Sequence, residues 1–227
     1  MNNIAHNFFT AIKKLTLLSV LLFSISSAQG VFITEIADPH NVATGGRFVE
    51  LYNNTDADVD LTGWALRRWT NANTDPQADK ALQGTIPAGG FFIITNSASD
   101  FEITYYIEAN QDIGIEGPAD GNGDDDLALI NANGEVVDLY GEGGGTDNSG
   151  TPWEFEDGRA ERIAAVTAGN PTGDPAEWNI DNDSGGGDGP QEAPTDYDPG
   201  AWVGHDADMG IVFDGTFGNS VYNENTY

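Results

Sequence analysis

Short hydrophobic runs, separated by clusters of glycine, asparagine, aspartate and proline, cover most of the chain after residue 30. The runs are rich in Val, Ile, Phe and Tyr, which favour strands, and the intervening clusters favour turns. The pattern predicts strands at Val31–Ala37, Phe48–Tyr52, Trp64–Trp69, Phe91–Thr95, Ile103–Ile107, Leu127–Ile130 and Val136–Tyr140. The one helix that it suggests before the C-terminal residues is Ala160–Val166, where the periodicity is weak. Many short strands with turns between them predict an all-β protein built as a sandwich.

Two local patterns indicate how these strands turn and which faces they bury. Asn133-Gly134 lies between the last two predicted strands and is a strong hairpin signal, because both turn positions require a positive φ. Val49 and Leu51 alternate with Glu50, and successive side chains of a strand point to opposite faces. We therefore expect Glu50 to point away from whatever Val49 and Leu51 bury.

The first 28 residues have the composition of a secretory signal. Lys13 and Lys14 supply the positive charge, Leu15–Ile25 is a short apolar run, and Ser26–Ala28 places small residues before a cleavage site. The apolar run is shorter than the roughly 20 residues that a transmembrane helix needs. The sequence therefore predicts cleavage after Ala28 and export to the periplasm, the cell surface or the medium, without membrane insertion.

The charge balance excludes some partners. The chain has a formal net charge of −29, and cleavage of the signal would leave six Lys and Arg against 37 Asp and Glu, a charge of −31. Such a surface repels phosphate groups, so we expect no binding to nucleic acid or to anionic lipid. The chain has no cysteine, which excludes disulfides, thiol catalysis and thiolate metal sites.

The most specific pattern lies in the first half of the predicted domain. The segments VFITEIADP, RFVELYNNTDADVDLTGWAL and IPAGGFFIIT follow one another within residues 31–95. They are followed by DDDLALINANGEVVDLYG at residues 124–141, and then by Arg162, Trp178 and Pro199–Trp202. Together these segments resemble the lamin-tail domain family in its bacterial, exported form, over Val31–Gly204.

The resemblance implies an immunoglobulin-like β-sandwich that serves as an interaction or accessory module and has no catalytic site. We expect a signal at residues 1–28, the sandwich at residues 29–204, and a tail at residues 205–227 with a last strand at Gly210–Phe213. The Gly/Asp-rich segment Asp181–Pro199 should fold back on the domain. The residues that we expect to be structural are Glu35, Glu50, Trp64 and Arg162. The two glutamates should accept hydrogen bonds or pair with Arg162 or Arg67.

Catalysis has little support in the sequence. Downstream of the predicted signal there are two histidines, His40 and His205, and neither lies in a nucleophile-elbow or zinc-protease motif. Glu35 and Glu50 could form an acid/base pair, which is the basis of a rival hypothesis, an exported hydrolase. We expect no enzyme activity.

An acidic loop suggests calcium. Asp120, Asn122 and Asp124 match the first three ligand positions of a Ca²⁺ loop, and Asp126 adds a further carboxylate. The match then fails, because an EF-hand needs glycine where Asp125 stands and glutamate where Asn131 stands. A second, weaker candidate is Asp181, Asn182 and Asp183 with Asp188. The alternative for both loops is that these residues only form turns.

The aromatic residues raise a third hypothesis. Trp69, Trp153, Phe155 and Trp202 are more rings than one core needs, and rings exposed in a row can stack on sugars. At least two of them would have to be exposed and coplanar for a glycan-binding platform. The preferred interpretation is an exported, non-catalytic interaction module, stabilised by Ca²⁺ if the acidic loop binds it. Its partner would be an unidentified protein or glycan, and a carbohydrate-binding module is the main alternative.

Overall fold

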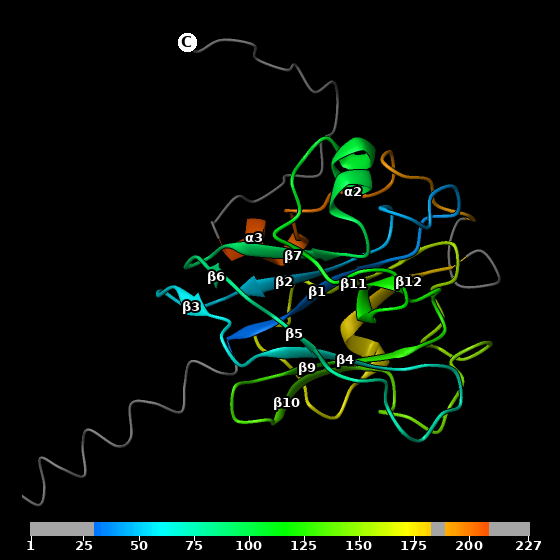
Figure 1. Ribbon diagram of the computed structural model, residues 1–227, viewed down its shortest axis with the longest axis horizontal. Helices are drawn as coiled ribbons and strands as arrows, with labels where there is room; N and C mark the ends of the chain where they lie inside the picture. The colour runs from blue at the N-terminus through cyan, green and yellow to red at the C-terminus, as the bar shows by residue number, and fades with distance from the viewer. Residues whose placement is uncertain (1–29, 183–188, 209–227) are drawn as a thin grey trace, which may run out of the picture.

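The computed structural model describes residues 30–182 and 189–208, and within them two β-sheets pack face to face (Figure 1). The predicted signal, the predicted strand Gly210–Phe213, and Asp183 and Asp188 of the second calcium candidate lie outside these residues. The large sheet has the order β12 (Trp178–Asp181), β11 (Arg159–Arg162), β1 (Val31–Ala37), β2 (Phe48–Asn53), β7 (Phe91–Thr95) and β8 (Gln111–Asp112). All its neighbours are antiparallel except β7 and β8. This confirms the predicted all-β, immunoglobulin-like sandwich.

The second sheet is smaller and lies below the first in Figure 1. Its order is β10 (Val136–Tyr140), β9 (Asp126–Ile130), β4 (Ala65–Trp69) and β5 (Lys80–Ala81). A short ribbon pairs β3 (Val59–Asp60) with β6 (Thr85–Ile86). The helical elements are α2 (Ala98–Tyr105), α3 (Val203–Asp208), and the 3₁₀ turns η1 (Pro118–Asp120) and η2 (Pro175–Glu177). None of the helices in the described ranges is long and apolar enough to cross a membrane.

The main core fills the space between the two sheets. Val49 and Leu51 point into it from β2, whereas Glu50 points to the other face of the sheet, as the alternation predicts. On β1 the register shifts between Ile33 and Glu35. This bulge matters because one extra residue reverses the alternation, so that Ile33 and Ile36 both reach the core.

The outer face of the large sheet is covered by α2 and by residues 189–204, which we call the C-terminal segment (Figure 1). One aromatic cluster packs Phe48 against Phe101 and Tyr105 of α2 and against Tyr197. A second cluster lies toward α3 and joins Phe32, Tyr52 and Trp202. The Gly/Asp-rich segment therefore folds back on the domain through its described part.

Two predicted elements are wrong. Arg159–Arg162, whose last three residues fall in the predicted helix, forms strand β11, because its alternating side chains place Ala160 in the core and Arg159 and Glu161 on the outer face. The predicted strand Ile103–Ile107 is largely replaced by α2, in which Phe101 and Tyr105 lie four residues apart and cover the sheet. Both segments have weak local patterns, and tertiary packing decides their structure.

Candidate functional site

Three carboxyl groups form a row on the outer face of the large sheet. Glu35 of β1 lies opposite Glu161 of β11 on one side and opposite Glu50 of β2 on the other. Residues directly opposite each other in antiparallel strands point to the same face, so Glu161, Glu35 and Glu50 are neighbours. All three are buried, because the row runs between the two aromatic clusters and beneath the C-terminal segment.

The Arg159 guanidinium forms ion pairs with members of this row. Arg159 Nη1 lies 3.4 Å from Glu35 Oε1 and 2.9 Å from Asp198 Oδ1, and its Nη2 lies 3.7 Å from Glu161 Oε2. Asp198 belongs to the C-terminal segment, so Arg159 also ties that segment to the sheet. Ionising every carboxyl group around this one positive charge would cost a large free energy in a buried site.

Glu50 is held by hydrogen bonds alone. The Thr34 hydroxyl donates to Glu50 Oε1 at 2.7 Å, and the Gly200 amide donates to Oε2 at 2.6 Å. Burial raises the pKa of Glu50 to about 8, although these two hydrogen bonds lower it. Burial, followed by the charge of Glu50, raises the pKa of Glu35 well above 4.5, and its Oε2 is buried without a hydrogen-bond partner. At neutral pH Glu50 therefore carries a proton.

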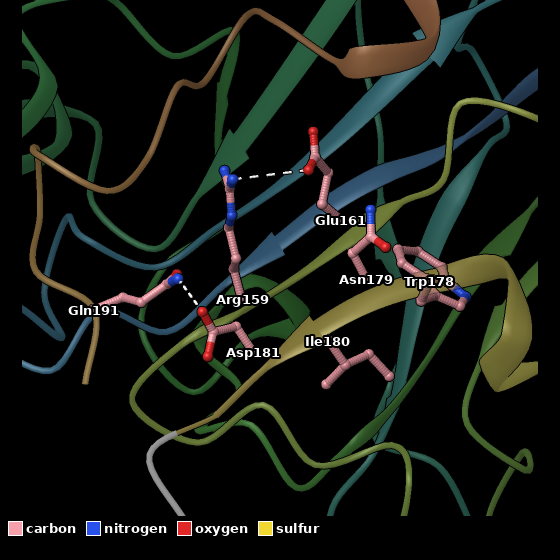
Figure 2. Close-up of a pocket in the computed structure, with 7 residues that line it drawn as sticks. All are labelled: Arg159, Glu161, Trp178, Asn179, Ile180, Asp181 and Gln191. Atoms are coloured by element: carbon pink, nitrogen blue, oxygen red, sulfur yellow. Dashed lines mark hydrogen bonds and ion pairs between the residues drawn. The ribbon is translucent and has the colours of Figure 1, made fainter. Parts of the chain in front are cut away.

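A polar pocket of about 450 Å³ opens at one end of the row. It is lined by Arg159, Glu161, Trp178, Asn179, Ile180, Asp181 and Gln191, and thus by all four residues of β12, the edge strand of the large sheet. Figure 2 shows Glu161 and Asn179 projecting to the same side of β11 and β12, with Arg159 beside them. Gln191 Nε2 donates to Asp181 Oδ2 and so closes one end of the pocket.

The predicted arginine partners of the glutamates are wrong. Arg67 pairs with Asp79, and Arg162 lies on the inner face of the sheet, where its Nη2 donates to Asp138 at 2.6 Å and its Nη1 to Glu177 at 2.7 Å. Register explains this: Arg162 is the neighbour of Glu161 on β11, so the two side chains point to opposite faces. The alternative prediction, that the glutamates accept hydrogen bonds, holds for Glu50.

The Arg162–Asp138 pair completes the backbone hydrogen bonding of β1. Ile33 lies beyond the paired part of β1 and β11, which runs from Glu35 to Ala37. Asp138 accepts from the Ile33 amide at 2.8 Å, and Arg162 Nε donates to the Ile33 carbonyl at 3.2 Å. The guanidinium carbon also lies 3.9 Å from the centre of the Trp178 ring. Trp64, the other residue expected to be structural, lies in the core between the sheets.

The acidic loop uses its carboxylates separately. Asp120 accepts from the Asn96 amide at 2.7 Å and from the Glu116 backbone at 2.6 Å. Asp126 accepts from Gly144 N at 2.6 Å and from Asn148 Nδ2 at 2.9 Å. Asp124 forms a hydrogen bond with Asn122, and burial and the charge of Asp147 raise its pKa. Among the side chains that the structure describes, no three acidic or histidine groups are placed so that they could hold a metal ion.

The histidines and tryptophans are dispersed. His40 Nδ1 lies 2.9 Å from Asp157 Oδ2, and the His205 ring packs on Tyr52 and Phe91. All five tryptophans are at most 7% exposed, so no row of tryptophans is available for stacking on a sugar. Of the rings proposed for a glycan platform, Trp153 and Phe155 lie in the main core, and Trp69 and Trp202 lie in separate buried clusters.

Sequence reasoning missed most of this site. Glu161 falls within the predicted helix Ala160–Val166, and Arg159 directly precedes that helix. Asp198 and Gln191 come from a segment whose path over the sheet has no local signal. No local signal identifies β11, because Ala160 is the one apolar residue of Arg159–Arg162 and the segment does not alternate apolar and polar residues.

Comparison with known proteins gives one finding. The family model described as Lamin Tail Domain matches residues 24–144, which is more than half of the chain. A search of curated proteins found no match to the chain. The matched residues contain β1 to β10, and therefore Glu35 and Glu50. They end before β11 and β12, so Arg159, Glu161 and the pocket lie outside the match.

Proposed function

The chain belongs to the lamin-tail domain family, and on that premise we propose that it is an exported, non-catalytic interaction module that binds a partner protein at the pocket along β12. Lamin-tail domains are immunoglobulin-like domains without catalytic activity, which suggests the same of this chain. The signal-like residues 1–28 support export.

The main observation in support of a non-catalytic function is the burial of Glu35 and Glu50. Glu35 and Glu50 are the two carboxyl groups that could have formed an acid/base pair, and both are fully buried beneath the C-terminal segment. A general acid must reach the atom that it protonates, either directly or through one water. Glu50 instead uses both its oxygens to bind Thr34 and Gly200, which is a structural role.

The described residues do not provide the features that the rival functions need. The rival hydrolase would place a histidine beside paired carboxylates in a cleft, whereas His40 pairs with one aspartate and His205 packs on aromatic rings. A carbohydrate-binding module would need exposed, coplanar rings, and the tryptophans are buried.

The pocket along β12 fits a protein partner. An edge strand presents backbone groups that an extended segment of another protein can pair with, and pockets beside the strand then select side chains. From β11 the pocket offers a guanidinium and a carboxylate, and from β12 an amide and a carboxylate. The Gln191 amide also lines it, and its Oε1 is buried without a hydrogen-bond partner.

A matched pair of substitutions tests the proposal. Asn179→Trp fills the pocket from an exposed position on β12, and Asn133→Trp makes the same change on the exposed β9–β10 turn. Immobilised wild type should enrich specific proteins from the extracellular fraction of its source cells, and Asn179→Trp should lose them while Asn133→Trp keeps them. Equal recovery by both variants would exclude the pocket, and polymer hydrolysis that Glu50→Gln abolishes would refute the non-catalytic assignment.

A further inference from the structure

The exposed apolar side chains of the described residues are concentrated in one part of the chain. Large hydrophobic residues are exposed at five positions, and four of them, Ile103, Tyr106, Ile107 and Ile115, lie within 13 residues. Single exposed apolar residues are common, but a local concentration marks an interaction surface.

Helix α2 is apolar on both sides at its C-terminal end. Phe101 and Tyr105 point to the sheet and are buried, whereas Ile103 is 72% exposed, Tyr106 82% and Ile107 38%. A helix that only covers a sheet carries polar residues on its outer side. Ile103 lies within α2, whereas Tyr106 is its left-handed C-cap and Ile107 follows the helix.

Tyr106 is unfavourable for the stability of the isolated domain. It ends α2 in the left-handed conformation with φ of 62°, and its amide donates to the Glu102 carbonyl. Glycine is the usual residue in this position, and a residue with a Cβ costs roughly 1–2 kcal/mol more in this conformation. The ring gains no burial in return.

Two carboxylates flank these apolar residues in sequence. Glu102 and Glu108 are exposed on either side of Ile103, Tyr106 and Ile107. Neither glutamate takes part in the ion pairs formed among the described residues. The sequence contains no lysine or arginine between Lys80 and Arg159, so these charges have no basic residue near them in sequence.

We propose that Glu102, Ile103, Tyr106, Ile107 and Glu108, the α2 patch, dock a basic, amphipathic segment of a partner protein. This docking site is separate from the pocket along β12 and goes beyond the function proposed for that pocket. Apolar side chains of the partner would cover Ile103 and Tyr106, while its lysines or arginines would pair with the two glutamates.

Charge argues against a second copy and against residues 209–227. A second copy of the mature protein would bring a surface with the same net charge of −31, which would oppose close contact. Residues 209–227 contain Asp214 and Glu224 but no lysine or arginine, so they lack the basic groups that this patch would pair with.

Binding to a defined probe tests the proposal. The probe is a fluorescent synthetic peptide with lysine and leucine at helical amphipathic spacing, titrated with full-length mature protein and followed by anisotropy. Ile103→Ser with Tyr106→Gly should weaken binding by about tenfold or more, the loss expected for removing the central apolar contacts. Glu102→Gln with Glu108→Gln should weaken it and reduce its dependence on salt.

Control variants and peptides decide the outcome. Val203→Ser removes another exposed apolar side chain, on α3, and should change the affinity by less than about twofold. Peptides with serine for leucine, or glutamate for lysine, should bind at least about tenfold more weakly. Equal binding by wild type and the Ile103/Tyr106 variant would overturn the inference, as would tighter binding to zwitterionic lipid vesicles than to the peptide. Neither result would affect the Asn179→Trp test, so failure of this docking role is distinguishable from failure of the proposed function.

Discussion

The large sheet buries acidic groups on both of its faces, and the two faces differ in how many hydrogen-bond and ion-pair partners these groups have. On the inner face, Asp138 accepts hydrogen bonds from Arg162 and from the backbone of Ile33 and Asn170, so the carboxylate is fully engaged. On the outer face, Glu35 keeps one oxygen without a partner and shares a single arginine with two other acids.

The difference shows that burial alone does not decide the state of a carboxyl group. A buried carboxylate remains ionised where a cation and several donors meet it, and it takes up a proton where they are too few. Asp138 has both a cation and backbone donors, and through them it completes the hydrogen bonding of β1. Glu35 and Glu50 have fewer of these partners, and burial raises the pKa of both groups.

Breaking the inner pair should have the largest effect. Arg162→Met should lower the free energy of unfolding by about 3–5 kcal/mol, because it leaves Asp138 buried without its cation. Arg67→Met is the control, since the Arg67–Asp79 pair is partly exposed and should contribute less than about 1 kcal/mol. Urea unfolding measures both variants. Equal losses would show that the inner pair is no stronger than a surface pair.

The outer row should make stability depend on pH. Glu50 has a pKa of about 8 when folded and about 4.5 when unfolded, so between these values the folded state binds more protons and stability falls as pH rises. Between pH 6 and 8 the loss should be about 2–3 kcal/mol, at up to 1.4 kcal/mol per pH unit for one proton. Glu35→Gln with Glu50→Gln should flatten this slope at high ionic strength.

Asp38 provides a control for that experiment. Its pKa is raised to about 6, mainly by burial. Its contribution to the free energy of unfolding is therefore lost as pH rises from about 4 to 6. Asp38→Asn should therefore leave most of the slope between pH 6 and 8 unchanged. If the Glu35→Gln, Glu50→Gln variant kept the wild-type dependence of stability on pH, groups other than these two glutamates would have to bind the protons.

A third acid, Asp124, sharpens the comparison, since it has neither an arginine nor full burial. Its Oδ1 lacks a hydrogen-bond partner, and partial burial and nearby acids raise its pKa. If Ca²⁺ binds the acidic loop, it should stabilise the fold by about 1.4 kcal/mol at a tenfold excess over Kd, and Asp120→Ala with Asp124→Ala should abolish this gain. Melting in Ca²⁺ and in Mg²⁺ at equal ionic strength tests it. An identical response to both ions would leave the loop as an acidic turn.

The smallest effect should come from outside both charged regions. Tyr106→Gly removes the left-handed strain at the end of α2 and should raise the free energy of unfolding by up to about 1 kcal/mol. Tyr106→Ala retains the strain and serves as the control for loss of the ring. Chemical denaturation separates the two. A glycine variant no more stable than the alanine variant would show that Tyr106 stores no strain.

The sequence predicts the inner face of the fold better than the outer face. Strands such as Val31–Ala37 and Phe91–Thr95 have the predicted bounds, because a dense run of apolar residues determines them locally. Glu50 could be placed on the outer face from Val49 and Leu51 alone. The groups around the acid row could not, since Arg159 and Gly200 reach it only through the pairing of β11 and the path of the C-terminal segment.

The protonation of Glu50 and Glu35 is the central claim, and a direct titration tests it. Carboxyl carbon NMR shifts of the two residues, assigned with the Glu35→Gln and Glu50→Gln variants, would be followed from pH 4 to 9. We predict a midpoint of about 8 for Glu50 and a midpoint well above 4.5 for Glu35. Titration of both residues near 4.5 would contradict the claim.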